Sequence, residues 1–344
     1  MEIDCRSNRN HWFGKRESRV KKIINGVETL GIIGLAKNTG KTTTLNYLID
    51  LYPNITLGLT SIGLDGEDLD QVNFLPKPKI VVHPGMMVAT AQACLDSSEL
   101  EFRVIEPTGL FTALGEVQII EVLREGTIVV AGPTTNHDLN ILIHKLKHYT
   151  DKVFVDGAFN RMTFASIELM DAIVLATGAS VHPVMDKTIE KTVKTVESFN
   201  LPKTEYFEFA PEYPLIVKTK NETYHFFDKK IDTIRTLVEK IDEPIIYMYI
   251  QGAITPRLID YLVQSSTRDF ELISDDPTKY LITEDHFTYL SKLNIKLSII
   301  HPCPLLFVTM NPFSPAGLHY DSDLFLSELK KKISIPVYNV KRME

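Results

Sequence analysis

From about residue 29 onward, short apolar runs alternate with longer stretches in which apolar residues recur every three or four positions. Short apolar runs are typical of buried strands, and the longer amphipathic stretches are typical of helices. This alternation predicts an α/β fold with a mostly parallel sheet flanked by helices. The clearest expected strands lie at 30–33, 55–60, 79–83, 102–105, 127–131, 152–155, 172–176 and 245–250, with later apolar runs at 279–282, 297–300 and 305–310. The clearest expected helices lie at 41–51 and 136–148, and a further helix is expected from about residue 256.

Changes in this pattern divide the chain into three parts. Residues 1–28 are polar and locally basic, and we expect a solvated arm ahead of the first strand. Residues 201–242 have a weaker pattern, and strand-like runs resume at Pro244. The sequence therefore predicts a main domain over 29–242 and a smaller C-terminal α/β domain over 243–344.

The first expected strand leads into a loop of small residues, and residues 30–44 read LGIIGLAKNTGKTTT. A buried strand, a glycine-containing loop and a helix in this order are typical of a phosphate-binding loop (P-loop), in which backbone N–H groups surround phosphate oxygens. We expect Lys41 to reach the β- and γ-phosphates and the Thr42 hydroxyl to bind Mg²⁺. The residues expected to hold the nucleotide are Gly34, Lys37, Asn38, Thr39, Gly40, Lys41, Thr42 and Thr43.

The loop departs from the usual spacing G-x-x-x-x-G-K-S/T, because one extra residue separates Gly34 from Gly40 and Leu35 occupies the first glycine position. The longer spacing resembles that of dethiobiotin synthetases. The K-N-T-G-K-T-T core resembles that of the molybdopterin-guanine dinucleotide accessory proteins. MinD-type ATPases, of the same branch of P-loop NTPases, carry a lysine four residues before the second glycine. Lys37 lies three residues before it, so we do not expect Lys37 to reach a neighbouring subunit's nucleotide.

Acidic residues follow several expected strands, where ligands bind in open α/β sheets. Asp65, in an acidic turn, is expected to hold Mg²⁺ directly or through water and to orient the attacking water. Asp156 follows the run at 152–155 and is the leading candidate for the carboxylate beside the P-loop. Glu106 follows the run at 102–105, and resemblance to dethiobiotin synthetases implies a Mg²⁺ ligand there. The alternative for each is an ordinary solvated turn or strand-end cap.

Lys41, Asp65 and Asp156 form the predicted catalytic set. Two glycine turns, at Gly132 and Gly178, could also expose N–H groups to an anion, although a tight connection between strand and helix is the favoured interpretation. The segment 311–315, with the sequence NPFSP, is expected to form a structured turn.

Composition narrows the class of protein. The formal net charge of −7 disfavours a nucleic-acid binder with a basic surface. Cys5, Cys94 and Cys303 lack the spacing of a zinc site or a disulfide framework, which favours a reducing, cytoplasmic setting. We find no apolar run long enough for a membrane span and no secretory signal peptide. The absence of an N-K-x-D guanine signature weakly favours ATP over GTP.

Six strings of the sequence together resemble one family, the P-loop subunit of the lysine 5,6-aminomutase reactivase. These strings are GLAKNTGKTTTLNYL, GLTSIGLDGEDLD, PKPKIVVHPG, VFVDGAFNR, DAIVLATGA and VTMNPFSPAG. The resemblance covers most of residues 29–344. It implies a Mg²⁺-dependent ATPase subunit that acts beside a second, MutS-like ATPase subunit. Together these subunits release damaged cobalamin from an adenosylcobalamin-dependent aminomutase of amino-acid fermentation.

Two other functions stay open at this stage. The first is an ATP-dependent synthetase of the dethiobiotin synthetase type, which would hydrolyse ATP only with a small carboxylate or amine present. The second is a non-enzymatic GTP-binding accessory protein. A remodelling ATPase should instead show slow basal hydrolysis that a protein partner changes. The identity of the aminomutase, the role of the C-terminal domain and the existence of a homo-oligomer stay open too.

Overall fold

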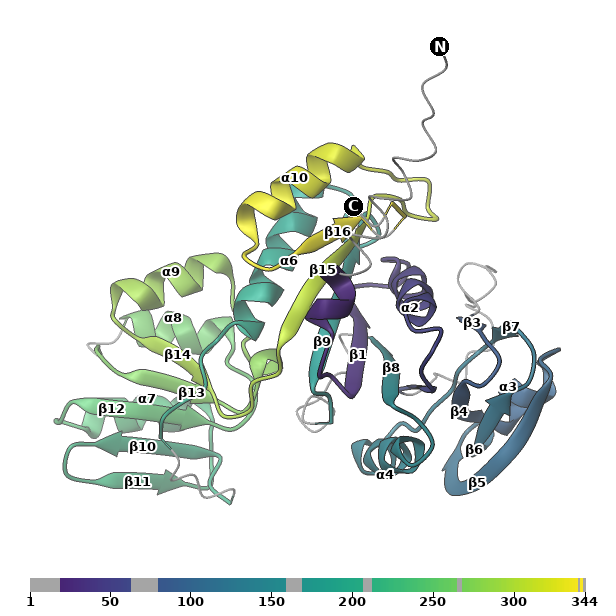
Figure 1. The fold of residues 1–344 in the computed structure, drawn as a ribbon. Coiled ribbons are helices and arrows are strands. Elements are labelled where there is room, and N and C mark those ends of the chain that lie inside the picture. Colours follow the sequence, from purple (N-terminus) through teal and green to yellow (C-terminus); the bar gives the residue numbers. More distant parts are fainter. Residues whose placement is uncertain are drawn as a thin grey trace, which may run out of the picture. The chain divides into compact units, whose positions relative to one another are not determined.

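The structure is a computed structural model with a large, mostly parallel central sheet flanked by helices (Figure 1). This confirms the α/β class expected from the alternation of strand and helix patterns. The described residues are 19–62, 80–158, 169–206, 212–264, 268–339 and 341–342. They form two compact units: unit 1 comprises the described residues of 1–188 and 305–344, and unit 2 those of 189–304.

The main sheet of unit 1 has nine strands among the described residues. In spatial order they are β16 (Val337–Asn339), β15 (Leu305–Asn311), β9 (Ala172–Gly178), β1 (Thr29–Gly34), β8 (Lys152–Ala158), β2 (Leu57–Ser61), β4 (Met87–Ala91), β6 (Gly115–Val122) and β5 (Phe102–Thr112). Pairing is parallel from β16 to β4 and antiparallel from β4 to β5. β1 is therefore an inner strand, and it is buried along its whole length.

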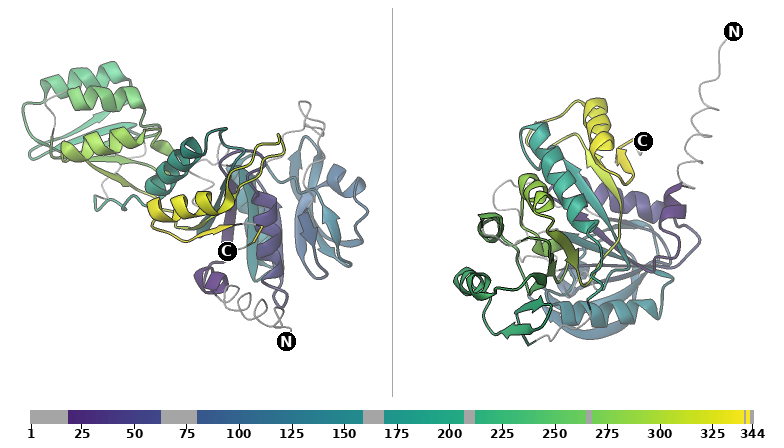
Figure 2. Two further views of the ribbon diagram at one scale, coloured as in Figure 1. Left: turned by 90° about the horizontal axis from the view of Figure 1, so that it is seen from above. Right: turned by 90° about the vertical axis from the view of Figure 1, so that its left-hand side faces the viewer.

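Helices cover this sheet where the sequence has an amphipathic pattern. The helices of unit 1 among the described residues include α2 (Lys41–Asp50), α3 (Gln92–Asp96), α4 (Asn136–Lys147) and α10 (Ser322–Lys332), whereas α6 (Met185–Phe199) begins in unit 1 and continues into unit 2. α2 lies beside β1 (Figures 1 and 2). Its residues Leu45, Leu48 and Ile49 are buried in the core of unit 1. α4 begins where the Thr135 hydroxyl accepts a hydrogen bond from Asp138 N–H at 3.1 Å, which is the usual N-cap arrangement. A separate antiparallel pair joins β3 (Ile80–Val82) to β7 (Gly126–Ile128).

The described end of the basic arm is amphipathic: its basic residues Arg19, Lys21 and Lys22 are exposed, as expected, but two apolar residues are buried. Residues 19–23 are helical, and Val20 and Ile24 are buried in the core of unit 1. Their spacing of four residues places both on one face of a helix. The side-chain ammonium of Lys152 donates a hydrogen bond to the carbonyl of Val27. This bond anchors the end of the segment.

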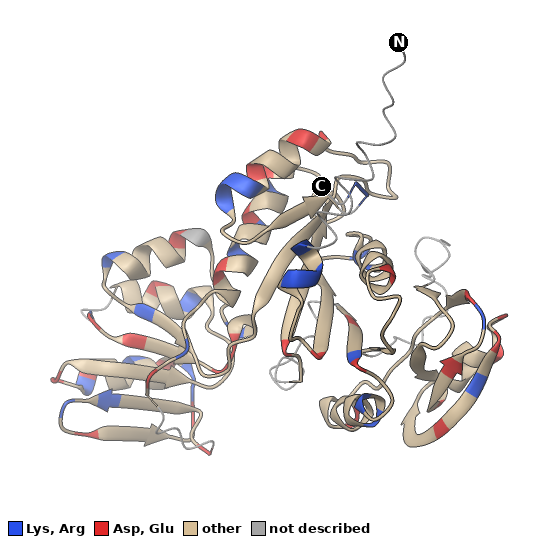
Figure 3. Ribbon diagram, in the orientation of Figure 1, with Lys and Arg blue, Asp and Glu red and all other residues tan. Residues whose placement is uncertain are grey.

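Unit 2 is built around a five-stranded sheet in the described residues. In spatial order the strands are β11 (Thr223–Phe226), β10 (Leu215–Thr219), β12 (Ile245–Ile250), β13 (Glu271–Ser274) and β14 (Lys296–Ile299). β12, β13 and β14 are parallel, and β10 is antiparallel to both β11 and β12. The helical segments are α7 (Ile231–Lys240), α8 (Pro256–Gln264), the 3₁₀ turn η2 (Pro277–Lys279) and α9 (Glu284–Lys292). In unit 1, α10 carries Asp323 in its first turn and Lys330, Lys331 and Lys332 in its last turn, which complements the helix dipole, and Figure 3 shows both signs of charge on the helices.

The two units meet in the sequence at residues 188/189 and 304/305, and not at the boundary expected at residue 243. β15 and β16 were expected in the C-terminal domain, yet β15 pairs with β9 in the main sheet of unit 1. The polar stretch 201–242 contains β10, β11 and α7 of unit 2. An apolar run predicts a strand but not the sheet that the strand joins, and this explains the difference. Among the described residues, no helix combines the length and apolar character required to cross a membrane.

Candidate functional site

The loop between β1 and α2 folds back tightly over the end of β1. A Cβ on Gly34 would lie 2.8 Å from Thr39 Oγ1 and 3.3 Å from the carbonyl of Ala36, so this position requires a glycine. Thr39 Oγ1 donates to the Ala36 carbonyl at 3.1 Å and closes the turn. Asn38 and Gly40 have φ values of 62° and 88°, in the left-handed region that glycine and asparagine adopt most readily.

The N-terminus of α2 is open. Gly40 provides no capping side chain, and the first turn holds no acidic residue. The N–H groups of residues 39–43 donate to no acceptor within the part of the chain that the structure describes, whereas Thr44 N–H bonds to the Gly40 carbonyl at 2.9 Å. Unpaired N–H groups at the positive end of the helix dipole attract anions, phosphate above all.

Lys41 and Asp156 meet beside this loop, although they are far apart in the sequence. Lys41 Nζ lies 2.8 Å from Asp156 Oδ1, and the two side chains are 25% and 18% exposed. Asp156 pairs with Ile32 in the parallel register of β8 and β1, which places its carboxylate next to the P-loop strand. Asp156 Oδ1 is buried and accepts no directed hydrogen bond from the described residues. Its contact with Lys41 Nζ is therefore an ion pair. A buried carboxylate oxygen without a hydrogen bond is well suited to bind a cation.

The end of β2 reaches the same edge of the sheet. Ile62 N–H donates to the Asp156 carbonyl at 2.9 Å, and Gly132 N–H donates to Ser61 Oγ at 2.9 Å. A Cβ on Gly132 would lie only 2.0 Å from the Ser61 carbonyl, so the Gly132 turn is a tight connection whose N–H group is engaged. The predicted Asp65 follows shortly after Ile62 but lies outside the described residues.

Glu106 lies apart from these residues. The prediction that a strand ends before Glu106 was wrong, because β5 continues to Thr112 at the edge of the sheet, separated from β8 by β2, β4 and β6. The apolar run that predicted the strand ends at Ile105, whereas the edge strand itself, which is half-exposed, continues beyond it. The Glu106 carboxylate pairs with Lys145 of α4 and accepts a hydrogen bond from the Tyr149 hydroxyl at 2.9 Å. The hydrogen bond from Lys145, above all, holds the pKa of Glu106 below its usual value.

The remaining predicted nucleotide-binding residues all lie on the loop or in the first turn of α2. Lys37, Asn38 and Thr43 are exposed, and Thr42 is half-buried. The described residues contain no group of three or more His, Cys, Asp or Glu suited to a metal ion.

Two polar residues contact the loop, and the sequence analysis assigned neither a role. Ser180, which follows β9, donates its hydroxyl to the Asn38 carbonyl at 3.3 Å. Asn311, the last residue of β15, donates its side-chain amide to the same carbonyl at 3.4 Å. Their position after apolar strands was the available signal, since the carboxyl ends of parallel strands meet at one edge of a sheet.

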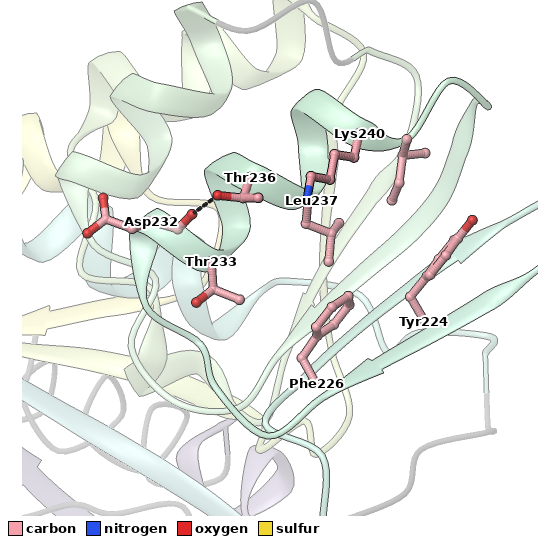
Figure 4. Close-up of a pocket in the computed structure, with 8 residues that line it drawn as sticks. Tyr224, Phe226, Asp232, Thr233, Thr236, Leu237 and Lys240 are labelled. Carbon is pink, nitrogen blue, oxygen red and sulfur yellow. Dashed lines mark hydrogen bonds between the residues drawn. The ribbon is translucent and has the colours of Figure 1, made fainter.

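Two hollows among the described residues lie elsewhere. In unit 1, a hollow of about 690 Å³ is lined by Asp50, Tyr52 and His83, among others, at the opposite end of α2. In unit 2, a hollow of about 500 Å³ lies between α7 and β11, from which Tyr224 and Phe226 extend toward the helix (Figure 4). Neither hollow includes a residue of the loop between β1 and α2.

No protein-family model and no curated protein matches the chain. The functional assignment therefore depends on the chemistry of the site and on the resemblance of sequence strings.

Proposed function

We propose that this chain binds Mg²⁺-ATP at the loop between β1 and α2 and hydrolyses it. The observation that carries the proposal is the 2.8 Å contact between Lys41 Nζ and Asp156 Oδ1, beside the unpaired N–H groups of residues 39–43. P-loop NTPases combine a cradle of backbone N–H groups, a lysine for the phosphates and a carboxylate for the metal ion. These three elements come from β1, α2 and β8, which are adjacent in the fold.

Each residue has a distinct role in this proposal. The N–H groups of residues 39–43 bind phosphate oxygens, and Lys41 moves from Asp156 to the β- and γ-phosphates. The Thr42 hydroxyl and Asp156 hold Mg²⁺, directly or through water, and the bound ion neutralises charge on the phosphates. The ion pair of Lys41 with Asp156 keeps both charges compensated before nucleotide binds. Asp65 stays a candidate for orienting the attacking water.

We further propose that the chain acts on a protein partner. The resemblance of six sequence strings to the lysine 5,6-aminomutase reactivase supports an adenosylcobalamin-dependent aminomutase as this partner. The chain would be the ATP-binding subunit of a reactivating factor, beside a second, MutS-like ATPase subunit. ATP binding would then favour one of two conformations that differ in their affinity for the mutase.

The test is Mg²⁺-dependent ATP hydrolysis by the purified full chain, with and without a cobalamin-dependent aminomutase. We expect slow basal hydrolysis that the mutase stimulates. Lys41→Ala should lower the rate about 100-fold or more, as does the loss of a donor to transition-state charge. Lys145→Ala is the matched control, because Lys145 also forms an ion pair but with Glu106 at the sheet edge. Its rate should equal that of the wild type.

The outcomes separate the two parts of the proposal. A wild-type chain that binds no nucleotide contradicts the ATPase assignment. Hydrolysis that ignores the mutase but requires a small carboxylate or amine contradicts the protein partner and supports a synthetase.

A further inference from the structure

The carbonyl of Asn38 is held by side chains from two other strand ends. Ser180 Oγ and Asn311 Nδ2 both donate to it, at 3.3 Å and 3.4 Å. Asn38 has a φ of 62°, which costs a non-glycine residue conformational energy. The two donors thus stabilise a left-handed peptide in the middle of the loop.

The orientation of this peptide determines the direction of the next N–H group. The described residues contain no cis peptide bond, and in a trans peptide the carbonyl and the following N–H group point in opposite directions. β9 and β15 lie on one side of β1, and β8 lies on the other. Because the Asn38 carbonyl is bound by residues that follow β9 and end β15, the Thr39 N–H group points away from Ser180 and Asn311.

The two donors are fixed to each other. Ala179 N–H donates to the Asn311 carbonyl at 3.0 Å, which joins the end of β9 to the end of β15. A Cβ on Gly178 would lie 2.3 Å from the same carbonyl, so the two backbones are in close contact. Ser180 follows directly in the chain, and its hydroxyl therefore lies beside the Asn311 side chain.

Tyr320 connects the segments that follow these strands. Its N–H group donates to the Pro312 carbonyl at 2.9 Å, and its hydroxyl donates to the His182 carbonyl. The same hydroxyl lies 2.8 Å from Thr188 Oγ1, within a buried pair. The segments that carry Ser180 and Asn311 are therefore held in place independently of the loop between β1 and α2.

We propose that Ser180 and Asn311 are positioning residues for phosphate binding. They fix the peptide between Asn38 and Thr39 so that the Thr39 N–H group is directed at a bound phosphate. The proposal rests on the ATP-binding function proposed above. The side chains of Ser180 and Asn311 act through the loop, and neither contacts the nucleotide.

The test compares variants of the full chain by titration calorimetry with Mg²⁺-ATP and, separately, with Mg²⁺-tripolyphosphate, which lacks the nucleoside. We expect Ser180→Ala and Asn311→Ala each to weaken the binding of both ligands about fivefold, the usual effect of one hydrogen bond. Both ligands should be affected equally. Ser180→Thr retains the hydroxyl and should bind as the wild type does. Ser327→Ala is the matched control, because the Ser327 hydroxyl bonds within α10.

The thermal unfolding temperature of each variant is measured first, and the titrations are carried out below it. This separates an effect on phosphate binding from an effect on the stability of the fold. Unchanged affinities in Ser180→Ala and Asn311→Ala would overturn the inference, whether or not the unfolding temperature falls. Weaker binding of ATP alone would also overturn it, because the side chains would then contact the nucleoside. If the wild type binds neither ligand, the proposed function itself fails.

Discussion

Units 1 and 2 both contain a parallel strand that leads into a helix through a glycine with a left-handed φ. In unit 1, β1 leads through Gly40 (φ 88°) to α2, and in unit 2, β12 leads through Gly252 (φ 94°) to α8. Both turns lie at the carboxyl ends of parallel strands, where ligands usually bind. By backbone geometry alone, the two turns are equally good candidates for a binding site.

In unit 2, polar groups at this turn bond to the carboxylate of Asp275, which follows the neighbouring strand β13. Gly252 N–H donates to Asp275 Oδ2 at 2.9 Å, and the Tyr249 hydroxyl donates to Asp275 Oδ1 at 2.6 Å. Burial and, after it, this hydrogen bond raise the pKa of Tyr249. α8 begins at Pro256, which has no N–H group to offer.

In unit 1, the corresponding N–H groups of residues 39–43 have no acceptor among the described residues, and a lysine–carboxylate pair lies beside them. The turn geometry does not by itself make a binding site. Phosphate binding requires donors that the protein leaves unpaired, near a charge that can change partner on binding.

The largest difference is expected between two aspartates. Asp156→Asn removes the charge proposed to hold Mg²⁺ and should lower Mg²⁺-dependent ATP hydrolysis about 100-fold or more. Asp275→Asn should leave hydrolysis unchanged but lower the free energy of unfolding by about 1 kcal/mol, because two part-buried hydrogen bonds are weakened. Enzyme assays and urea unfolding of both variants measure this. Equal hydrolysis in Asp156→Asn and the wild type would remove the distinction between the two turns.

A smaller difference is expected between the two glycines. Gly40→Ala and Gly252→Ala should each cost about 1–2 kcal/mol of stability, because alanine resists a left-handed φ. In Gly252→Ala, the new Cβ meets only the flexible end of Lys229, at 3.1 Å. Only Gly40→Ala should lose ATP affinity, about tenfold, because the substitution shifts the N–H groups of residues 39–43 that are proposed to bind phosphate. Calorimetry and unfolding measured together test this, and equal ATP affinity in the two variants would count against the account.

The smallest effect concerns Glu106, whose pKa is lowered chiefly by Lys145. A carboxylate with a lowered pKa stabilises the fold above its unfolded pKa, of about 4.3, and loses this contribution as the pH falls through the folded pKa. Glu106→Gln should therefore cost about 0.5 kcal/mol at neutral pH and little in acid, with ATP hydrolysis unchanged. Unfolding measured between neutral and acid pH checks this. Reduced hydrolysis would mean that Glu106 does act at the nucleotide site.

Much of the phosphate loop could be predicted from the sequence. The run at 30–33 and the helix from Lys41 were predicted correctly, because a fully buried strand and an amphipathic helix each leave a clear pattern. Asp156 was brought close to Lys41, as expected for residues near the carboxyl ends of adjacent parallel strands. Their roles toward nucleotide stay predictions.

Other features left no such pattern. β15 joins unit 1 and not unit 2, because sheet membership depends on long-range pairing with β9. Glu106 follows an apolar run just as Asp156 does, but it lies within an antiparallel edge strand. Ser180 and Asn311 bond to a single backbone carbonyl; their position after apolar strands predicts the edge of the sheet where they lie but not this contact.

The most direct test of the central claim follows the backbone N–H groups themselves. We would record ¹H–¹⁵N spectra of the deuterated full chain during titration with Mg²⁺-tripolyphosphate. The account predicts saturable shifts of the N–H signals of residues 39–43, with the signal of Gly252 unmoved. Unmoved signals for residues 39–43 at millimolar ligand, or an equal shift of Gly252, would contradict it.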